Sequence, residues 1–351
     1  MSARLPLDLI MRGEHPGSMA PSDATRLIDT FGRVHDNLRI SVTDRCNLRC
    51  TYCMPEDVTF RPKDELLTFE EITHFTRLAA SLGVSKIRLT GGEPLVRRDL
   101  YKLVAQIVEI PGIHDVGLTT NGLLLSAQAK QLYDAGLRRL NVSLDTLDAA
   151  RFRDITRRDG LDLVLAGLDA ARDAGFDPIK INAISMRGLT DLDAIPLAHY
   201  ARDNGFELRF IEYMPIGAEP WERSKMFPAS EIIELLEAEF GPLVEVPDAD
   251  PRAPALEYAY ADGKGSVGFI ASVTRPFCLK CNRLRLTAEG KLRNCLFALD
   301  EADVRPFLRG TYDDVELARV IRSTVWQKWE GHEINSARFI KPDRTMHAIG
   351  G

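Results

Sequence analysis

Six short runs of apolar and β-branched residues alternate with helix-like segments along the chain, and this alternation constrains the fold more than any other feature. The runs cover residues 38–44, 86–90, 115–120, 139–145, 179–186 and 207–214. The intervening segments with helical periodicity cover residues 68–83, 97–110, 126–136, 161–175 and 191–205. Strands that alternate with helices pair in parallel through right-handed crossovers, so the sequence predicts an α/β fold. Periodicity alone leaves open whether the sheet is doubly wound or curves into an incomplete barrel.

The residues with distinctive chemistry lie at the ends of these runs. Three cysteines follow the first run, and the motifs TGGEP, TTNG, SLDT and EYMP stand at the ends of the second, third, fourth and sixth. In either arrangement of parallel strands, ligands bind at the carboxyl ends of the strands. We therefore expect these loops, which are far apart in the sequence, to meet at one functional face.

Composition divides the chain into four parts. Residues 1–34 are rich in Gly, Pro, Ser and charge and predict a flexible N-terminal extension, and residues 35–215 hold the alternating core. The alternation then stops, and residues 216–340 predict a smaller α+β module. The elements expected in this module are helices near 228–240, 300–309 and 313–330 and strands near 256–260, 266–271, 283–287 and 291–295. Residues 341–351 form a tail that ends in Gly-Gly.

The overall composition is typical of a globular protein, with 45% hydrophobic and 27% charged residues. No apolar run approaches the roughly 20 residues that span a bilayer. No signal peptide is evident at the N-terminus, so we expect a cytoplasmic protein without a membrane partner. The net charge of −6 argues against general affinity for nucleic acid.

The six cysteines form two triplets with different spacing. Cys46, Cys50 and Cys53 have C-x3-C-x2-C spacing, and Cys278, Cys281 and Cys295 have C-x2-C-x13-C spacing. Three disulfides would suit a small secreted domain, so metal ligation is favoured for both triplets. A 4Fe–4S cluster has four irons, so three thiolates hold it and leave one iron open to another ligand. Zinc remains the alternative, although no fourth cysteine or well-spaced histidine completes either site.

The first triplet resembles the signature of the radical S-adenosylmethionine (SAM) superfamily, CxxxCxxC with an aromatic residue before the third cysteine. Tyr52 fills the aromatic position, and the GGEP motif of that superfamily stands at residues 91–94, where it would hold the SAM amino group. The resemblance implies that the open iron of a 4Fe–4S cluster chelates the amino and carboxylate groups of SAM. Reduction of such a cluster cleaves SAM to methionine and a 5′-deoxyadenosyl radical.

From about residue 27 to its C-terminus the sequence resembles, more narrowly, the GTP 3′,8-cyclase family. The resemblance is carried by DNLRISVTDRCNLRCTYCMPE, KIRLTGGEPLVRRDL, TTNG, LNVSLDTL, IKINAI, RFIEYMPIG, the second cysteine block and the final GG. It implies an incomplete (βα)6 barrel of the triosephosphate isomerase (TIM) type, with a smaller C-terminal α+β module that carries a second 4Fe–4S cluster. It also implies a lyase that abstracts the C3′ hydrogen of GTP and forms (8S)-3′,8-cyclo-7,8-dihydroguanosine 5′-triphosphate, the first step of molybdenum cofactor biosynthesis.

Carried over residue by residue, the resemblance implies four groups of site residues. Cys46, Cys50 and Cys53 hold the cluster that binds SAM, and Cys278, Cys281 and Cys295 hold the second cluster, whose open iron binds the guanine base. SAM is contacted by Tyr52, Gly92, Ser143 and Met214. GTP is bound by Arg39, Arg88, Thr119, Lys180, Arg283, Leu284 and Arg285. The terminal Gly350 and Gly351 reach into the active site and are needed for catalysis.

The residue types of the GTP group suit a triphosphate, because its buried charge needs several fixed cations. Taken alone, each of these cations would be read as a surface residue. Arg283 and Arg285 are harder to dismiss, because they alternate on one face of a strand that starts two residues after Cys281.

The resemblance further implies an external electron donor and a functional link to cyclic pyranopterin monophosphate synthase. It is compatible with a homodimer, and the residues themselves do not fix the oligomeric state. A radical SAM peptide-modifying maturase with an auxiliary cluster is the alternative enzyme, although such enzymes generally have more cysteines and do not need the RLR pair or the Gly-Gly end. An electron-transfer or zinc-structural protein is the alternative from another class, and it would need four protein ligands at each metal site.

Overall fold

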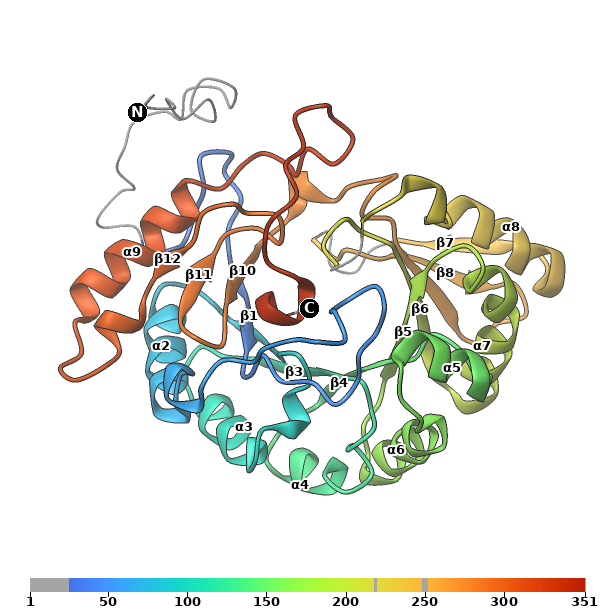
Figure 1. Ribbon diagram of the computed structural model, residues 1–351, viewed down its shortest axis with the longest axis horizontal. Coiled ribbons are helices and arrows are strands. Elements are labelled where there is room, and N and C mark those ends of the chain that lie inside the picture. The colour runs from blue at the N-terminus through green and yellow to red at the C-terminus, as the bar shows by residue number, and fades with distance from the viewer. Residues whose placement is uncertain (1–24, 218–219, 248–251, 351) are drawn as a thin grey trace.

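The fold is built on one curved sheet, which the computed structural model describes over residues 25–217, 220–247 and 252–350. Within these ranges the sheet has twelve strands in the order β12-β11-β10-β1-β2-β3-β4-β5-β6-β9-β8-β7. The sheet curves around a central space, with the helices that connect its strands on the outside (Figure 1). The C-terminal end of the chain lies inside this curve.

Six consecutive parallel strands form the centre of the sheet, as the alternating pattern predicted. They are β1 (Asn37–Ser41), β2 (Lys86–Thr90), β3 (Asp115–Thr120), β4 (Arg139–Ser143), β5 (Ile179–Ser185) and β6 (Glu207–Glu212). Each of the five neighbouring pairs is parallel. The fold is therefore the incomplete (βα)6 barrel, and the open doubly wound sheet is excluded by the curvature.

The connecting helices cover the outer face of the barrel. They are α2 (Phe69–Ser81), α3 (Leu100–Val108), α4 (Ala129–Asp134), α5 (Ala149–Thr156), α6 (Leu161–Ala174) and α7 (Thr190–Asn204). Helix α2 shows how local sequence sets an end. The Thr68 N–H donates to Glu71 at 2.7 Å, and the Glu71 N–H donates to the Thr68 hydroxyl at 3.2 Å, which is the capping box that the sequence predicted.

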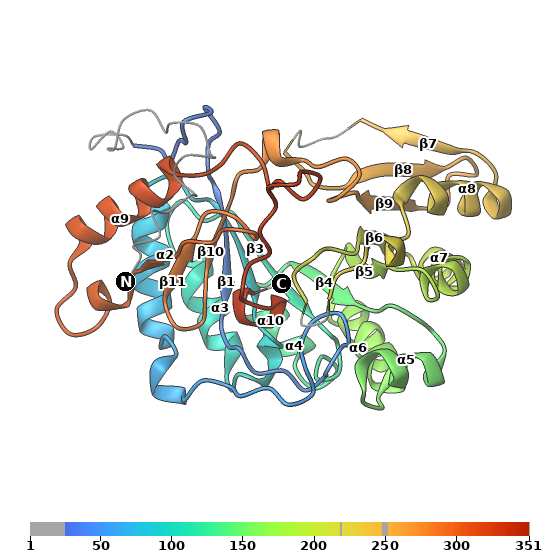
Figure 2. The ribbon, with the colours of Figure 1, turned by 45° about the horizontal axis from the view of Figure 1, so that its top comes forward.

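The C-terminal part of the chain continues the sheet at both edges of the six-stranded barrel. Strand β10 (Arg283–Leu286) pairs in parallel with β1, and β9 (Ser266–Ile270) pairs in parallel with β6. The remaining elements are α8 (Ala229–Phe240), β7 (Leu243–Val246), β8 (Leu256–Tyr260), β11 (Lys291–Arg293), β12 (Ala302–Asp303), α9 (Asp314–Trp326) and α10 (Met346–Ile349). The expected α+β module is present, but its strands extend the barrel sheet and do not form a separate one (Figure 2).

The described part of the N-terminal segment is packed, which differs from the expected flexible extension over residues 1–34. Residues 25–36, here called the N-terminal strap, include a bridge between Ile28 and Val34. Leu27 is buried in the core, and its N–H donates to the Leu82 carbonyl at 3.2 Å. The strap folds because these contacts satisfy its apolar and backbone groups. Residues 1–24 lie outside the described ranges.

In the part of the chain that the structure describes, no helix has both the length and the apolar content needed to cross a bilayer.

Candidate active site

The first cysteine triplet lies in the loop that follows β1. Its three thiols are free and partly exposed. The Cys53 N–H donates to the Cys50 carbonyl at 2.9 Å, which closes a tight turn, and the Leu48 N–H points at the Cys46 sulfur at 3.4 Å. Burial raises the pKa of Cys46 to about 11 and that of Cys53 to about 12. Burial thus disfavours the thiolate form at these positions, and a metal cluster bound by the loop would supply the positive charge that stabilises thiolates.

The second triplet combines a short helical turn with a hairpin. Cys278 and Cys281 flank the 3-10 turn before β10, and Cys295 follows β11. Burial raises the pKa of Cys278 to about 11. Burial also raises that of Cys281, but the ammonium of Lys328 and the guanidinium of Arg283 outweigh it and lower the pKa to about 7. The second triplet is therefore better prepared to form a thiolate than the first.

Lys328 is a buried cation that faces this triplet. Its side-chain nitrogen lies 3.5 Å from the Cys281 sulfur and donates to the Arg283 carbonyl at 2.9 Å. It is 3% exposed, and within the described ranges it forms no ion pair with a carboxylate. A buried ammonium needs a nearby anion, and a metal-bound thiolate supplies one. The donor set thus fits an anionic cluster.

A single zinc ion receives no support from the geometry. Over residues 25–217, 220–247 and 252–350, no group of three or more His, Cys, Asp or Glu side chains is arranged to hold one metal ion. A zinc site needs its ligands to converge on one point, whereas thiols at the corners of a 4Fe–4S cube lie apart.

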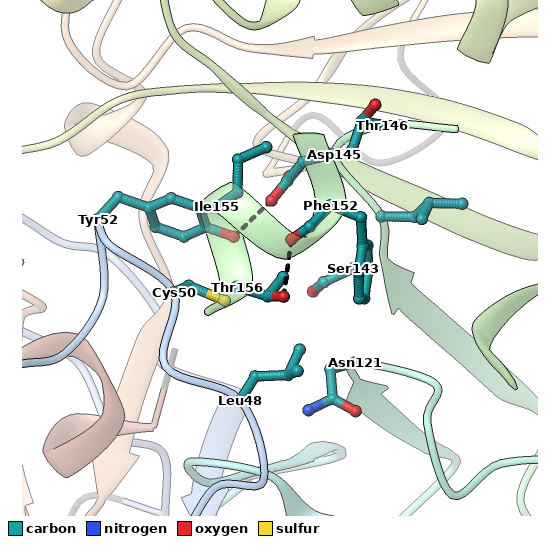
Figure 3. A pocket seen from close by; sticks show the side chains of 11 residues that line it. Leu48, Cys50, Tyr52, Asn121, Ser143, Asp145, Thr146, Phe152, Ile155 and Thr156 are labelled. Atoms are coloured by element: carbon teal, nitrogen blue, oxygen red, sulfur yellow. Dashed lines mark hydrogen bonds between the residues drawn. The ribbon is translucent and has the colours of Figure 1, made fainter. Parts of the chain in front are cut away.

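A small cavity beside the first triplet brings together residues from three strand ends. Its lining includes Cys50, Tyr52, Asn121, Ser143 and Asp145 (Figure 3). The Tyr52 hydroxyl donates to Asp145 at 2.7 Å, and the Ile184 N–H donates to the other Asp145 oxygen at 2.8 Å. Asp145 therefore ties the cysteine loop to β4 and β5. Of the predicted SAM residues, Tyr52 and Ser143 meet here.

The GGEP motif lies against the start of the cysteine loop. The Gly92 N–H donates to the Thr43 carbonyl at 2.8 Å. A Cβ on Gly92 would lie 2.5 Å from the Arg45 carbonyl oxygen, and one on Gly91 would lie 2.6 Å from the Thr43 carbonyl oxygen. Only glycine permits this close approach of two backbones. The motif therefore shapes the loop, whatever ligand it also contacts.

Four arginines cluster on three neighbouring strands near the second triplet. In the strand register Arg39 lies opposite Arg88 on β2 and opposite Arg285 on β10, and Arg283 is two residues before Arg285. None of the four pairs with a carboxylate in the described parts of the chain. Burial, followed by the neighbouring arginines, lowers the pKa of Arg39 well below its usual range. A row of buried cations without carboxylate partners is suited to bind a polyanion.

The other predicted GTP residues are placed less uniformly. Thr119 lies on β3 opposite Asn141, whose side-chain oxygen accepts from Arg88 at 2.9 Å. Lys180 already has a carboxylate partner in Glu207. Leu284 is 1% exposed and belongs to the apolar core. Its side chain faces away from the arginine row, so only its backbone is available to a ligand.

The C-terminal tail enters the barrel, where it reaches Cys53 of the first triplet and Arg285 of β10. The His347 N–H bonds to the Cys53 sulfur, and the Gly350 carbonyl accepts from Arg285. Met214, predicted to contact SAM, packs against the small apolar cluster that includes Ile349. Gly351 lies outside the described residues. The predicted approach of the tail to the site is thus present as far as Gly350.

Sequence reasoning missed several polar residues of the site. Asp145, Asn141 and Lys328 hold site residues through the contacts given above. Asp145 stands in SLDT, so its position at a strand end was a usable signal. Lys328 had no such signal, because it is 47 residues from Cys281 in the sequence.

Two family models match the chain in succession. The Radical SAM superfamily model matches residues 40–201, and the Molybdenum Cofactor Synthesis C model matches residues 206–334. Among curated relatives, a protein of Rhodopirellula baltica named GTP 3′,8-cyclase is 47% identical over 346 residues, covering 97% of this chain and 96% of that one. A protein of the same name from Mycolicibacterium smegmatis is 47% identical over 350 residues, covering 97% and 95%.

Solved structures agree on the fold. The crystal structure of Streptococcus suis SuiB bound to S-adenosylmethionine superposes with a TM-score of 0.60 at 17% identity, covering 83% of this chain and 69% of that one. A second SuiB crystal structure gives a TM-score of 0.61 at 14% identity, covering 87% and 69%. At such low identity the likeness concerns the fold alone.

Proposed function

Because this chain belongs to the GTP 3′,8-cyclase family of radical SAM enzymes, we propose that it forms 3′,8-cyclo-7,8-dihydro-GTP from GTP, the first step of molybdenum cofactor biosynthesis. In this proposal the first triplet holds a 4Fe–4S cluster that binds SAM. The second triplet holds a second 4Fe–4S cluster, which binds the guanine base.

The observation that carries this proposal is the row of unpaired arginines beside the second triplet. Arg285 on β10, Arg39 on β1 and Arg88 on β2 lie side by side, and Arg283 lies two residues before Arg285 on β10. Mutual repulsion and burial make this cluster unfavourable until an anion binds. A triphosphate supplies enough negative charge, and its binding would orient the ribose toward the centre of the barrel.

On the SAM side, the residues act by positioning. Tyr52 is held by Asp145, and Ser143 lies in the same cavity, so the adenosyl group would lie between the cysteine loop and β4. Gly92 stands where the backbone of the GGEP motif meets the loop. A reduced 4Fe–4S cluster held by Cys46, Cys50 and Cys53 would supply the electron that cleaves bound SAM, and the 5′-deoxyadenosyl radical so released would remove the C3′ hydrogen of GTP.

The chain's contribution to the reaction is geometric and electrostatic. The arginines fix the phosphates, the second triplet with Lys328 fixes the base end, and the tail fills the opening between them. Holding the two reactants in one geometry removes most of the entropic barrier between them. The buried tail also keeps oxygen and other radical traps away from the radical, which prevents side reactions.

We further propose how the enzyme works in the cell. An external electron donor reduces the first cluster, and the product passes to cyclic pyranopterin monophosphate synthase. The enzyme works in the cytoplasm, and a homodimer is compatible with this role. A peptide-modifying maturase is not favoured, because near-full-length relatives are named for GTP.

The proposal is tested by anaerobic reconstitution, metal analysis and incubation with SAM, GTP and a strong reductant. We expect about eight irons per chain, because two 4Fe–4S clusters carry four each. We expect 5′-deoxyadenosine release that depends on GTP, together with a cyclised GTP product. Zinc in place of iron would contradict both clusters, and SAM cleavage without a cyclised product would favour the maturase.

Arg285→Ala separates the two substrates in the same assay. We expect GTP cyclisation to fall at least about 100-fold, because one charged contact to phosphate is lost in a low-dielectric site. Uncoupled SAM cleavage should be largely intact. Arg319→Ala is the matched control, since Arg319 is exposed on α9 and pairs with Glu316. Equal loss of both activities in Arg285→Ala would count against a GTP-specific role.

A further inference from the structure

The C-terminal tail is a short segment that lies between the first cysteine triplet and β10. After α9 the chain runs across the open side of the barrel and ends in α10, at the centre of the curve (Figure 1). His347 and Ile349 are buried there. The His347 backbone lies against Cys53 and the Gly350 carbonyl accepts from Arg285, so the position of the segment matters to both halves of the site.

A tail of this length does not hold its own shape. Helix α10 has four residues, and a single helical turn is unstable in isolation because nucleation costs more than one turn returns. The apolar contacts of Ile349 contribute, but the segment immediately before α10 must also be fixed. The structure shows one charged side chain that does this.

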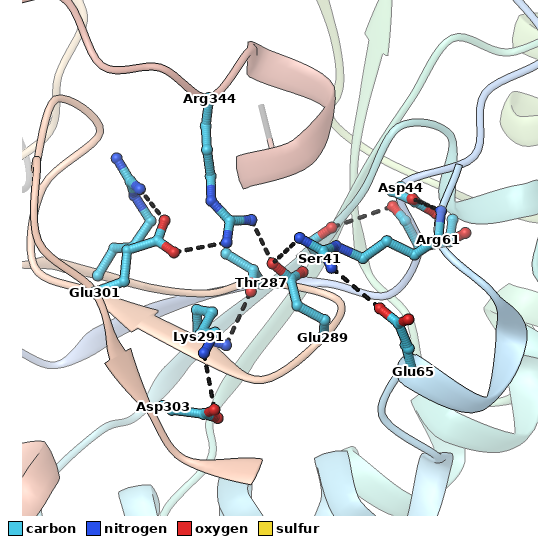
Figure 4. A network of polar contacts seen from close by, with 12 residues as sticks. Ser41, Asp44, Arg61, Glu65, Thr287, Glu289, Lys291, Glu301, Asp303 and Arg344 are labelled. Carbon is cyan, nitrogen blue, oxygen red and sulfur yellow. Dashed lines mark hydrogen bonds and ion pairs between the residues drawn. The ribbon is translucent and has the colours of Figure 1, made fainter. Parts of the chain in front are cut away.

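Arg344 joins the tail to the rest of the molecule through two carboxylates. One of its terminal nitrogens pairs with Glu289, and the other lies 2.6 Å from Glu301 (Figure 4). Glu289 is 3% exposed and sits in the turn between β10 and β11, and Glu301 directly precedes β12. We call Glu289, Glu301 and Arg344 the tail latch.

The remaining contacts of the two carboxylates show why Arg344 matters to them. Glu301 also pairs with Arg293. Besides Arg344, the one ion-pair partner of Glu289 among the described residues is Arg61, at 3.6 Å. The Arg61 side chain is 43% exposed and also pairs with Glu65. Removing Arg344 would therefore leave the buried Glu289 charge poorly compensated.

The latch attaches the tail to the β10–β11 hairpin, which carries Arg283 and Arg285. Arg285 lies on β10, four residues before Glu289, and it holds the Gly350 carbonyl. The tail thus has two fixed points on the same hairpin, Arg344 at its entry and Gly350 at its end. Only residues 345–349 lie between them. The position of Arg344 therefore determines how far Gly350 extends into the barrel.

Gly350 has little room to shift from its position in the barrel. Gly350 has a φ of +80°, and a Cβ there would lie 2.6 Å from the Thr90 hydroxyl oxygen and 3.0 Å from the Ser41 Cβ. A shift of one residue would place the side chain of Ile349 in this space. Only glycine fits between the ends of β1 and β2.

We propose that Arg344 is a positioning residue for the cyclisation, which acts by latching the tail through Glu289 and Glu301 so that Gly350 lies beside Arg285 at the ends of β1 and β2. The inference rests on the proposed function for its catalytic consequence, but the latch itself is a property of the fold. Arg344 touches neither cysteine triplet nor any of the four arginines among its described contacts.

The test compares Arg344→Gln and Glu289→Gln with wild type in the reconstituted holoenzyme. Hydrogen–deuterium exchange of the peptide that covers residues 345–350 should be at least about tenfold faster in both variants, because a partly buried ion pair is lost and the tail opens locally. The kcat for GTP cyclisation should fall at least about tenfold, because near-attack geometry is lost. Iron content and uncoupled SAM cleavage should match wild type.

Arg338→Gln is the matched control, because Arg338 pairs with Glu333 on the surface, just before the tail. It should change neither exchange nor kcat. The double variant Glu289→Gln/Arg344→Gln should be no worse than the worse single variant if the two residues act through their contact. Should Glu289→Gln fail to fold, Arg344→Gln carries the test alone, since its side chain is 21% exposed.

Wild-type exchange over residues 345–350 in Arg344→Gln would overturn the latch, and so would a loosened tail with unchanged kcat. Were wild type itself unable to cyclise GTP, the proposed function would fail separately. The exchange comparison would then still support or overturn the latch.

Discussion

Glu93 shows how one side chain of a signature motif serves the fold as well as the site. Its carboxylate accepts from the Leu95 N–H at 2.9 Å, the Thr120 hydroxyl at 2.7 Å and the Asn121 N–H at 2.7 Å. It is 1% exposed, and burial raises its pKa to about 7 in spite of these bonds. Glu93 thus ties the end of β2 to the end of β3, which the motif alone did not reveal.

Glu93→Gln should therefore lower the free energy of unfolding by about 2 kcal/mol, because an amide nitrogen would replace an acceptor and leave a buried donor unpaired. Denaturant unfolding followed by circular dichroism measures this. Glu109→Gln is the control, since Glu109 is exposed at the end of α3. Wild-type stability in Glu93→Gln would mean that these bonds contribute little to the fold.

At the scale of elements, the N-terminal strap (residues 25–36) supports the second cysteine triplet. Arg33 pairs with Asp29 at 2.6 Å and donates to the carbonyls of Cys278 and Trp329 at 2.7 and 2.6 Å. His35 lies 2.9 Å from Asp29 and is fully buried. A segment rich in charge looked flexible in the sequence, but these charges pair with each other and with backbone carbonyls from the C-terminal part.

The buried His35 in this strap should make the stability of the fold depend on pH. Burial lowers the pKa of His35 from 6.5 to about 4, although Asp29 opposes the shift. The folded state therefore favours neutral His35. The contribution of neutral His35 to the free energy of unfolding is complete above pH 6.5. It is lost as pH falls from 6.5 toward 4, because protonation then favours the unfolded chain. At pH 5 the loss should be about 2 kcal/mol, from 1.36 kcal/mol per pH unit.

Denaturant unfolding at pH 7, 6 and 5 measures this dependence. His35→Gln should flatten the decline of stability between pH 7 and 5, and His114→Gln, at an exposed position, should keep it. The lowered pKa of Asp29, about 2, affects stability only below its usual value of 3.8, outside this window. Equal slopes in wild type and His35→Gln would contradict the assignment.

At the scale of the whole molecule, the C-terminal part completes the barrel on both sides. Strand β10 covers the edge of β1, and β9 covers the edge of β6. Phe269, Leu284 and Leu286 from these strands are fully buried in the same core as the barrel strands. The two family models divide the chain near residue 206, but the core does not divide there.

A chain that ends at Gly217 should consequently fail to fold cooperatively. It would expose two long parallel strand edges and the apolar surface that β9 and β10 cover. We expect strong binding of a hydrophobic dye, loss of near-ultraviolet circular dichroism and aggregation at micromolar concentration. A soluble product with a sharp unfolding transition would show that the barrel core is independent of the C-terminal part.

The sequence by itself determined the features that depend on near neighbours. The periods of the six strands and their helices, the capping box at Thr68 and Glu71, and the spacing of both cysteine triplets were all readable. So was the gathering of motifs at the carboxyl ends of the strands, because parallel pairing follows from alternation. Arg283 and Arg285 could be placed on one face, since the side chains of a strand alternate.

Only the tertiary structure decided which distant segments meet. It placed β10 beside β1, so that Arg39 lies opposite Arg285, and it brought Lys328 to Cys281 and Arg344 to Glu289. It also turned the charged N-terminal strap into a packed element. These contacts join segments that are tens to hundreds of residues apart. They are selected by burial of apolar faces and by pairing of buried charges across the whole molecule, and no local period or spacing records them.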